Sequence, residues 1–196
     1  MSNSQMKQDR EQAPRKPFQW VTVQGLLVAI VFGLVALVFV ALKITLPIPG
    51  TEFVSDPREL LVTLGSAISG PVGALIIGFL AGVADTSETV LPSIVAHIVA
   101  GMFLAIAYRF WTRLLDKSTF RLAFLWILSI VVYYFGMLMP AFFITYQLTQ
   151  PEPFDFWQAY IGVARGGVGE IVLIVFITTV VLLLLPRRYR RPLWGN

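Results

Sequence analysis

The sequence predicts an all-α integral membrane protein: a six-helix transmembrane bundle with a short helical hairpin (segments two and three) and both termini in the cytoplasm. Of its 196 residues, 57% are hydrophobic and only 13% are charged, about half the charged fraction of a soluble protein. Several stretches between Trp20 and Leu185 carry almost no charge and are long enough to cross about 30 Å of hydrocarbon. A soluble domain is therefore excluded.

The elements follow in order along the chain. Residues 1–17 are polar and cannot form a core, so we expect a disordered cytoplasmic leader. A first helix begins near residue 18 and ends before Pro47-Ile48-Pro49-Gly50, where two prolines and a glycine stop regular structure. Further apolar segments follow at 57–84, 90–111, 121–147 and 156–185. We expect one transmembrane bundle over 18–186 and a basic cytoplasmic tail over 187–196.

The segment 57–84 decides the topology. It is apolar but interrupted at Ser69-Gly70-Pro71. Lys and Arg mark cytoplasmic loops, and most of the 15 basic residues lie in the leader, around 109–121 and in the tail. These regions share one side only if 57–84 turns back as a hairpin. A helix of about 12 residues is only about 18 Å long, so the hairpin either crosses or re-enters, shielded by protein.

The first helix carries a strip of small residues, Gly25, Ala29 and Gly33, at four-residue spacing. Such a strip lets another helix approach closely. It either packs within the same molecule or docks a different membrane subunit, and the spacing is compatible with both.

Three ionisable residues lie deep in apolar segments: His97, Arg165 and Glu170. A charge at mid-bilayer costs about 3 kcal/mol or more and faces a partner or a watered cavity. On a regular helix, Arg165 and Glu170 point about 140° apart. They either line a ligand cavity, with the glycines between them letting the helix unwind, or hold neighbouring helices together. His97 follows Ser93 by one turn but lacks an orienting carboxylate in sequence, so a helix–helix hydrogen bond is favoured over catalysis.

Further candidate ligand contacts lie toward the outer side. Lys43 reaches an anionic ligand or snorkels to the interface. Trp157 and Tyr160 belong to an aromatic run that forms an interfacial belt or stacks on a flat ligand.

The amino-acid composition argues against several classes of function. There are no cysteines and one histidine, which argues against a metal centre. We expect no cofactor and no enzymatic activity. The basic residues lie at membrane edges, which favours lipid over nucleic acid as a partner.

Residues 64–74 (LGSAISGPVGA), 78–85 (GFLAGVAD) and 91–108, with His97 and Gly101, resemble the S components of energy-coupling factor (ECF) transporters. The resemblance implies a substrate-capture subunit in a bacterial or archaeal plasma membrane. It would bind a small organic, vitamin-like ligand from the outer side. A T component and two ATPase subunits would be its partners.

Two other interpretations stay open. The membrane module of LytS-like sensor kinases has a similar glycine-rich, multi-helix pattern, although a cytoplasmic signalling domain follows it there. This chain ends at Asn196, so a sensor would need a separate signalling partner. A structural accessory subunit of a larger membrane complex would need no ligand.

Overall fold

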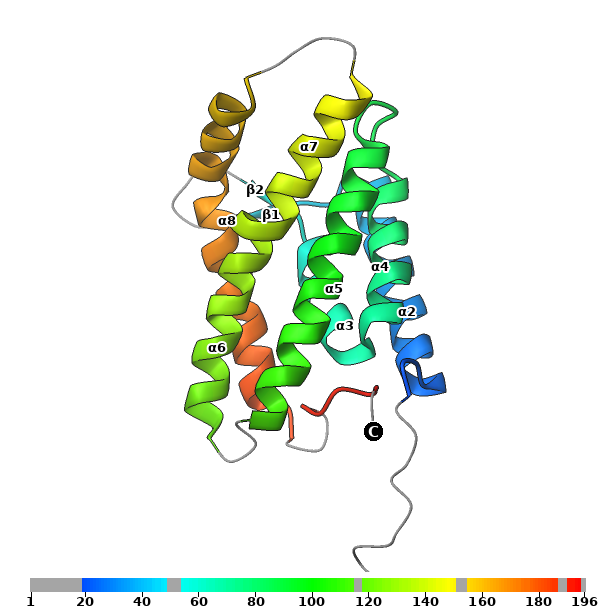
Figure 1. Cartoon of the computed structure of the whole chain (residues 1–196), viewed down its shortest axis with the longest axis vertical. Coiled ribbons are helices and arrows are strands. Elements are labelled where there is room, and N and C mark those ends of the chain that lie inside the picture. The colour runs from blue at the N-terminus through cyan, green and yellow to red at the C-terminus, as the bar shows by residue number, and fades with distance from the viewer. Residues whose placement is uncertain (1–18, 49–53, 115–117, 151–154, 187–189, 195–196) are drawn as a thin grey trace, which may run out of the picture.

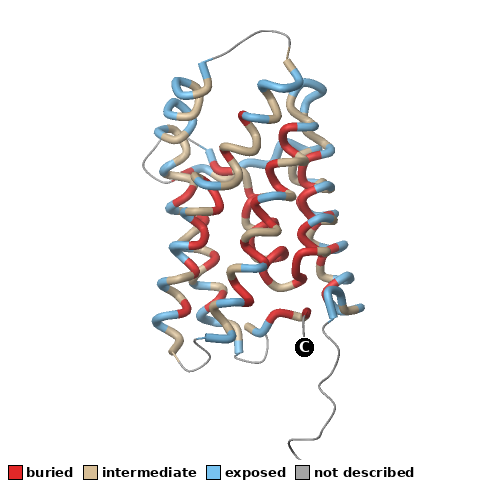
Figure 2. The backbone as a smooth tube through the Cα atoms, viewed as in Figure 1, coloured by how far each residue is buried: buried red, intermediate tan, exposed pale blue. Residues whose placement is uncertain are grey.

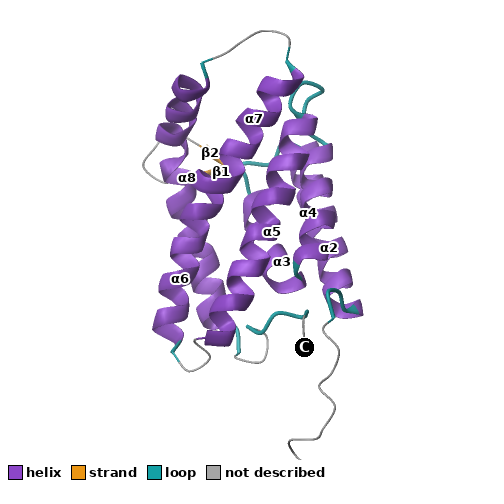
Figure 3. Ribbon diagram, in the orientation of Figure 1, coloured by secondary structure: helices purple, strands orange, loops and turns teal. Residues whose placement is uncertain are grey.

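The computed structural model describes residues 19–48, 54–114, 118–150, 155–186 and 190–194. They form a helical bundle with one two-stranded antiparallel ladder (Figures 1 and 3). The elements are α2 (Val23–Ala41), β1 (Leu46–Pro47), β2 (Val54–Ser55), α3 (Arg58–Ser69), α4 (Pro71–Val83), α5 (Val90–Leu114), α6 (Thr119–Val132), η1 (Tyr133–Leu138), α7 (Met139–Thr149) and α8 (Phe156–Leu184). The expected leader over 1–17 lies outside the described residues.

Four helical segments within the described residues are long and apolar enough to cross a membrane, instead of the six predicted. They are α2, α5, the continuous rod α6–η1–α7 and α8. The chain is thus a multi-pass helical membrane protein. The predicted number of spans was too high because two of the six were assigned to residues 57–84. The helices there, α3 and α4, have only 12 and 13 residues. Both are shorter than the roughly 20 residues that a spanning helix needs.

The turn of this short hairpin is at Gly70. Its φ of 91° belongs to a region that L-residues with a side chain rarely adopt. A Cβ at this position would also collide with the ring of Trp194. Pro71 then begins α4, where its fixed φ suits the first helical turn. The interruption at Ser69-Gly70-Pro71 is therefore a tight turn between two helices that pack on each other.

The hairpin lies between α2 and α5, and small residues let these helices approach it. The strip Gly25, Ala29 and Gly33 is buried against the hairpin: a Cβ on Gly25 would lie 3.1 Å from Ser69 O, and one on Gly33 2.6 Å from Leu80 Cδ1. The strip therefore contacts helices of its own chain. The other faces of α2 expose large apolar side chains, as suits a helix in lipid. Figure 2 shows how exposed and buried residues are distributed over the bundle.

The two ends of the bundle differ in charge. Acidic side chains lie where α3, α5 and α8 begin: Asp56, Glu59, Asp85, Glu88 and Asp155. Basic side chains gather at the opposite end, which also holds the described C-terminal residues (Figure 1): Arg109, Arg113, Arg121, Arg190 and Arg191. We call these the acidic end and the basic end.

Residues 190–194, which we call the C-terminal strap, fold back under the hairpin turn. Leu193 N donates to Ile68 O at 2.9 Å, and Thr22 Oγ1 donates to Leu193 O at 2.6 Å. The guanidinium of Arg109 donates to Trp194 O and lies 4.8 Å from the centre of its ring. The expected basic tail is thus tied to the bundle over 190–194, whereas 187–189 and 195–196 lie outside the described residues.

Candidate ligand cavity at the acidic end

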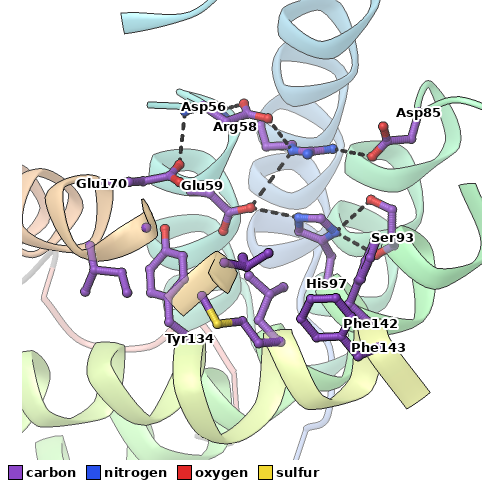
Figure 4. Close-up of a pocket in the computed structure, with 16 residues that line it drawn as sticks. Asp56, Arg58, Glu59, Asp85, Ser93, His97, Tyr134, Phe142, Phe143 and Glu170 are labelled. Carbon is purple, nitrogen blue, oxygen red and sulfur yellow. Dashed lines mark hydrogen bonds and ion pairs between the residues drawn. The ribbon is translucent and has the colours of Figure 1, made fainter. Parts of the chain in front are cut away.

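A partly open cavity of about 340 Å³ lies near the acidic end, lined by residues of α3, α5, the η1–α7 segment and α8 and by Asp56 and Asp85. This volume is at the lower end of the range of small-molecule sites. One wall is polar and carries Asp56, Arg58, Glu59 and His97. The lining also includes apolar side chains, Leu138, Met139, Phe142 and Phe143, of which Figure 4 labels the two phenylalanines.

A buried ion pair or hydrogen-bonded pair, Glu59–His97, joins α3 to α5. Each residue is only 4% exposed, and Glu59 Oε1 lies 2.8 Å from His97 Nε2. His97 Nδ1 lies 2.6 Å from the carbonyl oxygen of Ser93, which only accepts, so Nδ1 carries a proton. Tyr133 Oη donates to Glu59 Oε2 at 2.8 Å. The single proton between Glu59 and His97 makes the pair electrically neutral whichever residue holds it.

Arg58, the first residue of α3, is the centre of a second cluster of charged residues. Its Nε lies 2.7 Å from Asp56 Oδ2, and its Nη1 donates to Asp85 Oδ2 at 3.1 Å and to Ala81 O at 3.0 Å. Burial raises the pKa of the Asp56 carboxyl although Arg58 opposes that shift. Burial acts in the same sense on Asp85, but the charge and hydrogen bonds of its neighbours, Arg58 foremost, outweigh it and hold the pKa of Asp85 below its ordinary value.

Glu170 reaches the cavity from α8. Its Oε1 accepts hydrogen bonds from Asp56 N at 3.0 Å and from Ser55 Oγ at 3.4 Å. These contacts tie α8 to β2 and the start of α3. The α8 helix runs without a break through Gly166, Gly167 and Gly169, so it brings Glu170 to the cavity without the unwinding considered above.

Two consecutive tyrosines face the interior from η1, which is a π-helical stretch. Tyr133 bonds Glu59, as described above. The hydroxyl of Tyr134 points toward Glu59 and Glu170 in Figure 4, but it has no hydrogen-bond partner among the described residues, and the residue is only 3% exposed. Single π-helical turns occur often at functional sites because the wider turn re-aims neighbouring side chains.

Two of the sequence-derived candidate ligand residues, His97 and Glu170, line this cavity. The other four lie elsewhere. Lys43 is exposed at the end of α2, and Arg165 is exposed on α8. Trp157 is 68% exposed. Tyr160 is half-buried and donates to Phe135 O at 2.7 Å, and its ring lies near that of Phe143.

Sequence analysis did not single out Arg58, Glu59, Asp85 or Tyr134 as candidate site residues. One signal was present: Arg58 and Glu59 are adjacent charges at the start of an otherwise apolar segment. Nothing in the local sequence indicates that Glu59 meets a histidine 38 positions away.

The fold and the cavity define a class: a multi-pass helical membrane protein with buried charges grouped around a small cavity. A family model described as 5TMR of 5TMR-LYT, the LytS-like five-transmembrane receptor family, matches residues 18–152. Because the match covers more than half of the chain, the protein belongs to this family. No curated protein and no solved structure matches the chain.

Family membership overturns the resemblance to ECF S components, and the expected T component and ATPase subunits lose their basis with it. The glycine pattern misled for a physical reason. A Cβ on Gly78 would lie 2.7 Å from Ile98 N, and one on Gly82 2.5 Å from Ile94 N. These glycines report how closely α4 approaches α5, and that information does not identify a function.

Proposed function

We propose that this chain is the membrane-embedded sensing module of a receptor in a bacterial or archaeal plasma membrane. It binds a small molecule in the cavity at the acidic end. Its basic end faces the cytoplasm, in line with the distribution of Lys and Arg. The observation that carries the proposal is the cavity itself, in a chain of the LytS-like receptor family. Charges buried at membrane depth mark functional sites because they are costly to maintain.

The hairpin supplies a route from the cavity to the basic end. Arg58 and Glu59, at the first turn of α3, line the cavity. Ile68 and Gly70, at its other end, contact the C-terminal strap. One helix of 12 residues thus touches both regions. A ligand that moves the start of α3 therefore shifts the turn against the strap, which is the kind of small helix displacement that receptors use.

Filling the cavity tests ligand capture. Gly167 lines the cavity, and a Cβ there would meet only Met139 Cε, at 3.6 Å, so Gly167→Leu places a side chain in the cavity with little backbone strain. Gly162→Leu is the matched control on the same helix, because a Cβ at Gly162 meets nothing within 4 Å. In a thermal-shift screen of purified protein against small metabolites, we expect compounds that stabilise the wild type and Gly162→Leu but not Gly167→Leu. A screen in which every stabilising compound acts equally on both variants would refute capture in this cavity.

The strap provides the readout for signalling. The chain has no native cysteine, so Leu193→Cys introduces a single reactive thiol beside Ile68. We expect a stabilising compound to change the rate at which a maleimide labels this thiol. An unchanged rate at saturating compound would show that binding does not reach the strap.

The orientation has a separate test. Ser87→Cys, in the loop between α4 and α5, should react with an impermeant maleimide from outside intact cells. Ser118→Cys, at the start of α6, should react only after the membrane is opened. The reverse pattern would invert the proposed topology.

A further inference from the structure

We infer that the ligand of this cavity is a small organic cation, whose ammonium group is held by Glu170 and Tyr134 and whose apolar part lies on Phe142 and Phe143. This inference rests on the proposed function, that the cavity captures a ligand. Three independent features of the cavity carry it: the balance of charge, an unused hydrogen-bonding group, and the aromatic part of the lining.

Carboxylates outnumber cations around the cavity. The Glu59–His97 pair is neutral, because one proton is shared between its two facing atoms. Arg58 supplies one positive charge for two carboxylates, Asp56 and Asp85. Glu170 receives only neutral donors, a backbone N–H and a hydroxyl. Three carboxylates, Asp56, Asp85 and Glu170, thus face the single guanidinium of Arg58, so acidic groups predominate in this part of the lining and attract an opposite charge.

The second feature is the hydroxyl of Tyr134. It is buried, lines the cavity and lacks a hydrogen-bond partner among the described residues. A buried polar group without a partner costs about 1–3 kcal/mol, and a group bound in the cavity can supply the partner that this hydroxyl lacks. Both hydrogen bonds to Glu170 end on Oε1, which leaves Oε2 as a second acceptor on the carboxylate toward which this hydroxyl points (Figure 4). An ammonium group has several N–H donors and satisfies both oxygens.

The third feature is the aromatic part of the lining, which comprises Phe142, Phe143 and Tyr134. Aromatic faces attract cations through their quadrupoles and bury apolar carbon. An anion would meet these faces and the carboxylates with unfavourable electrostatics. Arg58 already forms ion pairs with Asp56 and Asp85, and its Nη1 donates to Ala81 O. Its Nε makes no hydrogen bond among the described residues, but its positive charge is already shared between two carboxylates.

A metal ion is a poorer occupant than an organic cation. In the part of the chain that the structure describes, no group of three or more His, Asp or Glu side chains is arranged to hold one. The apolar part of the lining also offers nothing to a bare metal ion, whereas it suits the carbon skeleton of an amine.

Matched probes test the inference. Benzylammonium, benzoate and benzyl alcohol share a skeleton and differ in charge, as do butylammonium, butyrate and butanol. Binding is measured by saturation-transfer NMR and thermal shift on the purified full chain. We expect at least one ammonium probe to bind and its matched acid and alcohol to bind at least tenfold more weakly. Glu170→Gln should weaken the ammonium probe about 30-fold, as expected for loss of one partner of a buried charge pair, and Tyr134→Phe should weaken it severalfold.

Glu88→Gln is the control variant, because Glu88 is an exposed carboxylate at the same end and outside the cavity lining. It should leave binding unchanged, and equal losses in Glu88→Gln and Glu170→Gln would reduce the effect to general surface charge and overturn the inference. Stronger binding of a carboxylate probe than of its matched ammonium would overturn the inference that the ligand is a cation. If Gly167→Leu abolished that binding, ligand capture in this cavity would still be upheld. Binding of none of the six probes would also overturn the inference, and the metabolite screen of Gly167→Leu would still decide the proposed function.

Discussion

The two ends of the α3–α4 hairpin are stabilised in opposite ways. At the acidic end, α3 begins with Arg58, which pairs with the partly exposed Asp85, and with Glu59, which is buried against His97. At the turn, Gly70 packs under the ring of Trp194 without a charge of its own. The turn is fixed by steric fit, whereas the acidic end is fixed by a polar network beside a cavity.

The two kinds of contact differ in how readily they rearrange when a ligand binds. A close-packed contact between a glycine and an aromatic ring has few alternative arrangements, because protein interiors are packed as densely as crystals. A polar network beside a cavity can exchange partners when a ligand enters. We therefore propose that the start of α3 responds to the ligand and that its turn transmits the change, and the following predictions test that division.

The largest expected effect is at Glu59. Glu59→Leu removes the partner of both His97 and Tyr133 and leaves them buried. We expect a loss of about 3–5 kcal/mol in the free energy of unfolding, the usual cost of breaking a buried charged pair. Titration with denaturing detergent measures it. The double variant Glu59→Leu, His97→Leu should recover part of the loss, and strictly additive losses would show that the two residues do not interact.

The second largest loss of stability is expected from a substitution at the hairpin turn. Gly70→Ala adds a Cβ at a φ of 91°, which costs about 1–2 kcal/mol, and it also displaces Trp194. We expect a total loss of about 2–3 kcal/mol, together with faster maleimide labelling of Leu193→Cys. Gly162→Ala, on an open face of α8, is the control and should not be destabilising. Unchanged labelling in Gly70→Ala would show that the strap does not depend on the turn.

Asp85 should have a smaller and pH-dependent effect. Its pKa in the folded chain lies below the ordinary value of 3.8, so its contribution to stability is complete above that value and is lost as pH falls through the folded pKa. We expect Asp85→Asn to cost about 1 kcal/mol at pH 7, since the pair with Arg58 is partly exposed. The difference from wild type should shrink below about pH 4, as thermal midpoints across this range would reveal. A difference that grows on acidification would contradict this assignment.

The smallest effect is expected at Arg165. The side chain is exposed on α8, away from both regions of the comparison. Arg165→Gln should change the free energy of unfolding by no more than about 0.5 kcal/mol and leave ammonium binding unchanged. A tenfold loss of binding would place Arg165 at the site after all and would move the ligand toward the surface of α8.

Several features of the protein were determined by local sequence alone. Apolar length predicted the four long spans, because a helix must cross about 30 Å of hydrocarbon whatever its neighbours are. Gly70 and Pro71 predicted the hairpin turn, because backbone geometry is a local property. The rule that an ionisable residue in an apolar segment needs a partner or a cavity predicted the setting of His97 and Glu170, which line the cavity, but not that of Arg165, which is exposed. The number of spans was wrong: hydropathy counts apolar residues, and α3 and α4 proved too short to span.

Only the tertiary structure decided the site. Glu59 and His97, or Arg58 and Asp85, become partners because the hairpin turns at Gly70 and α5 packs against both of its helices. The π-helical stretch that points Tyr133 and Tyr134 inward leaves no signature in composition. The strip Gly25, Ala29 and Gly33 predicted a close helix approach, but the identity of the approaching helix required the fold. Spacing within one helix fixes which side chains share a face, whereas contacts between helices depend on how every turn and loop places them.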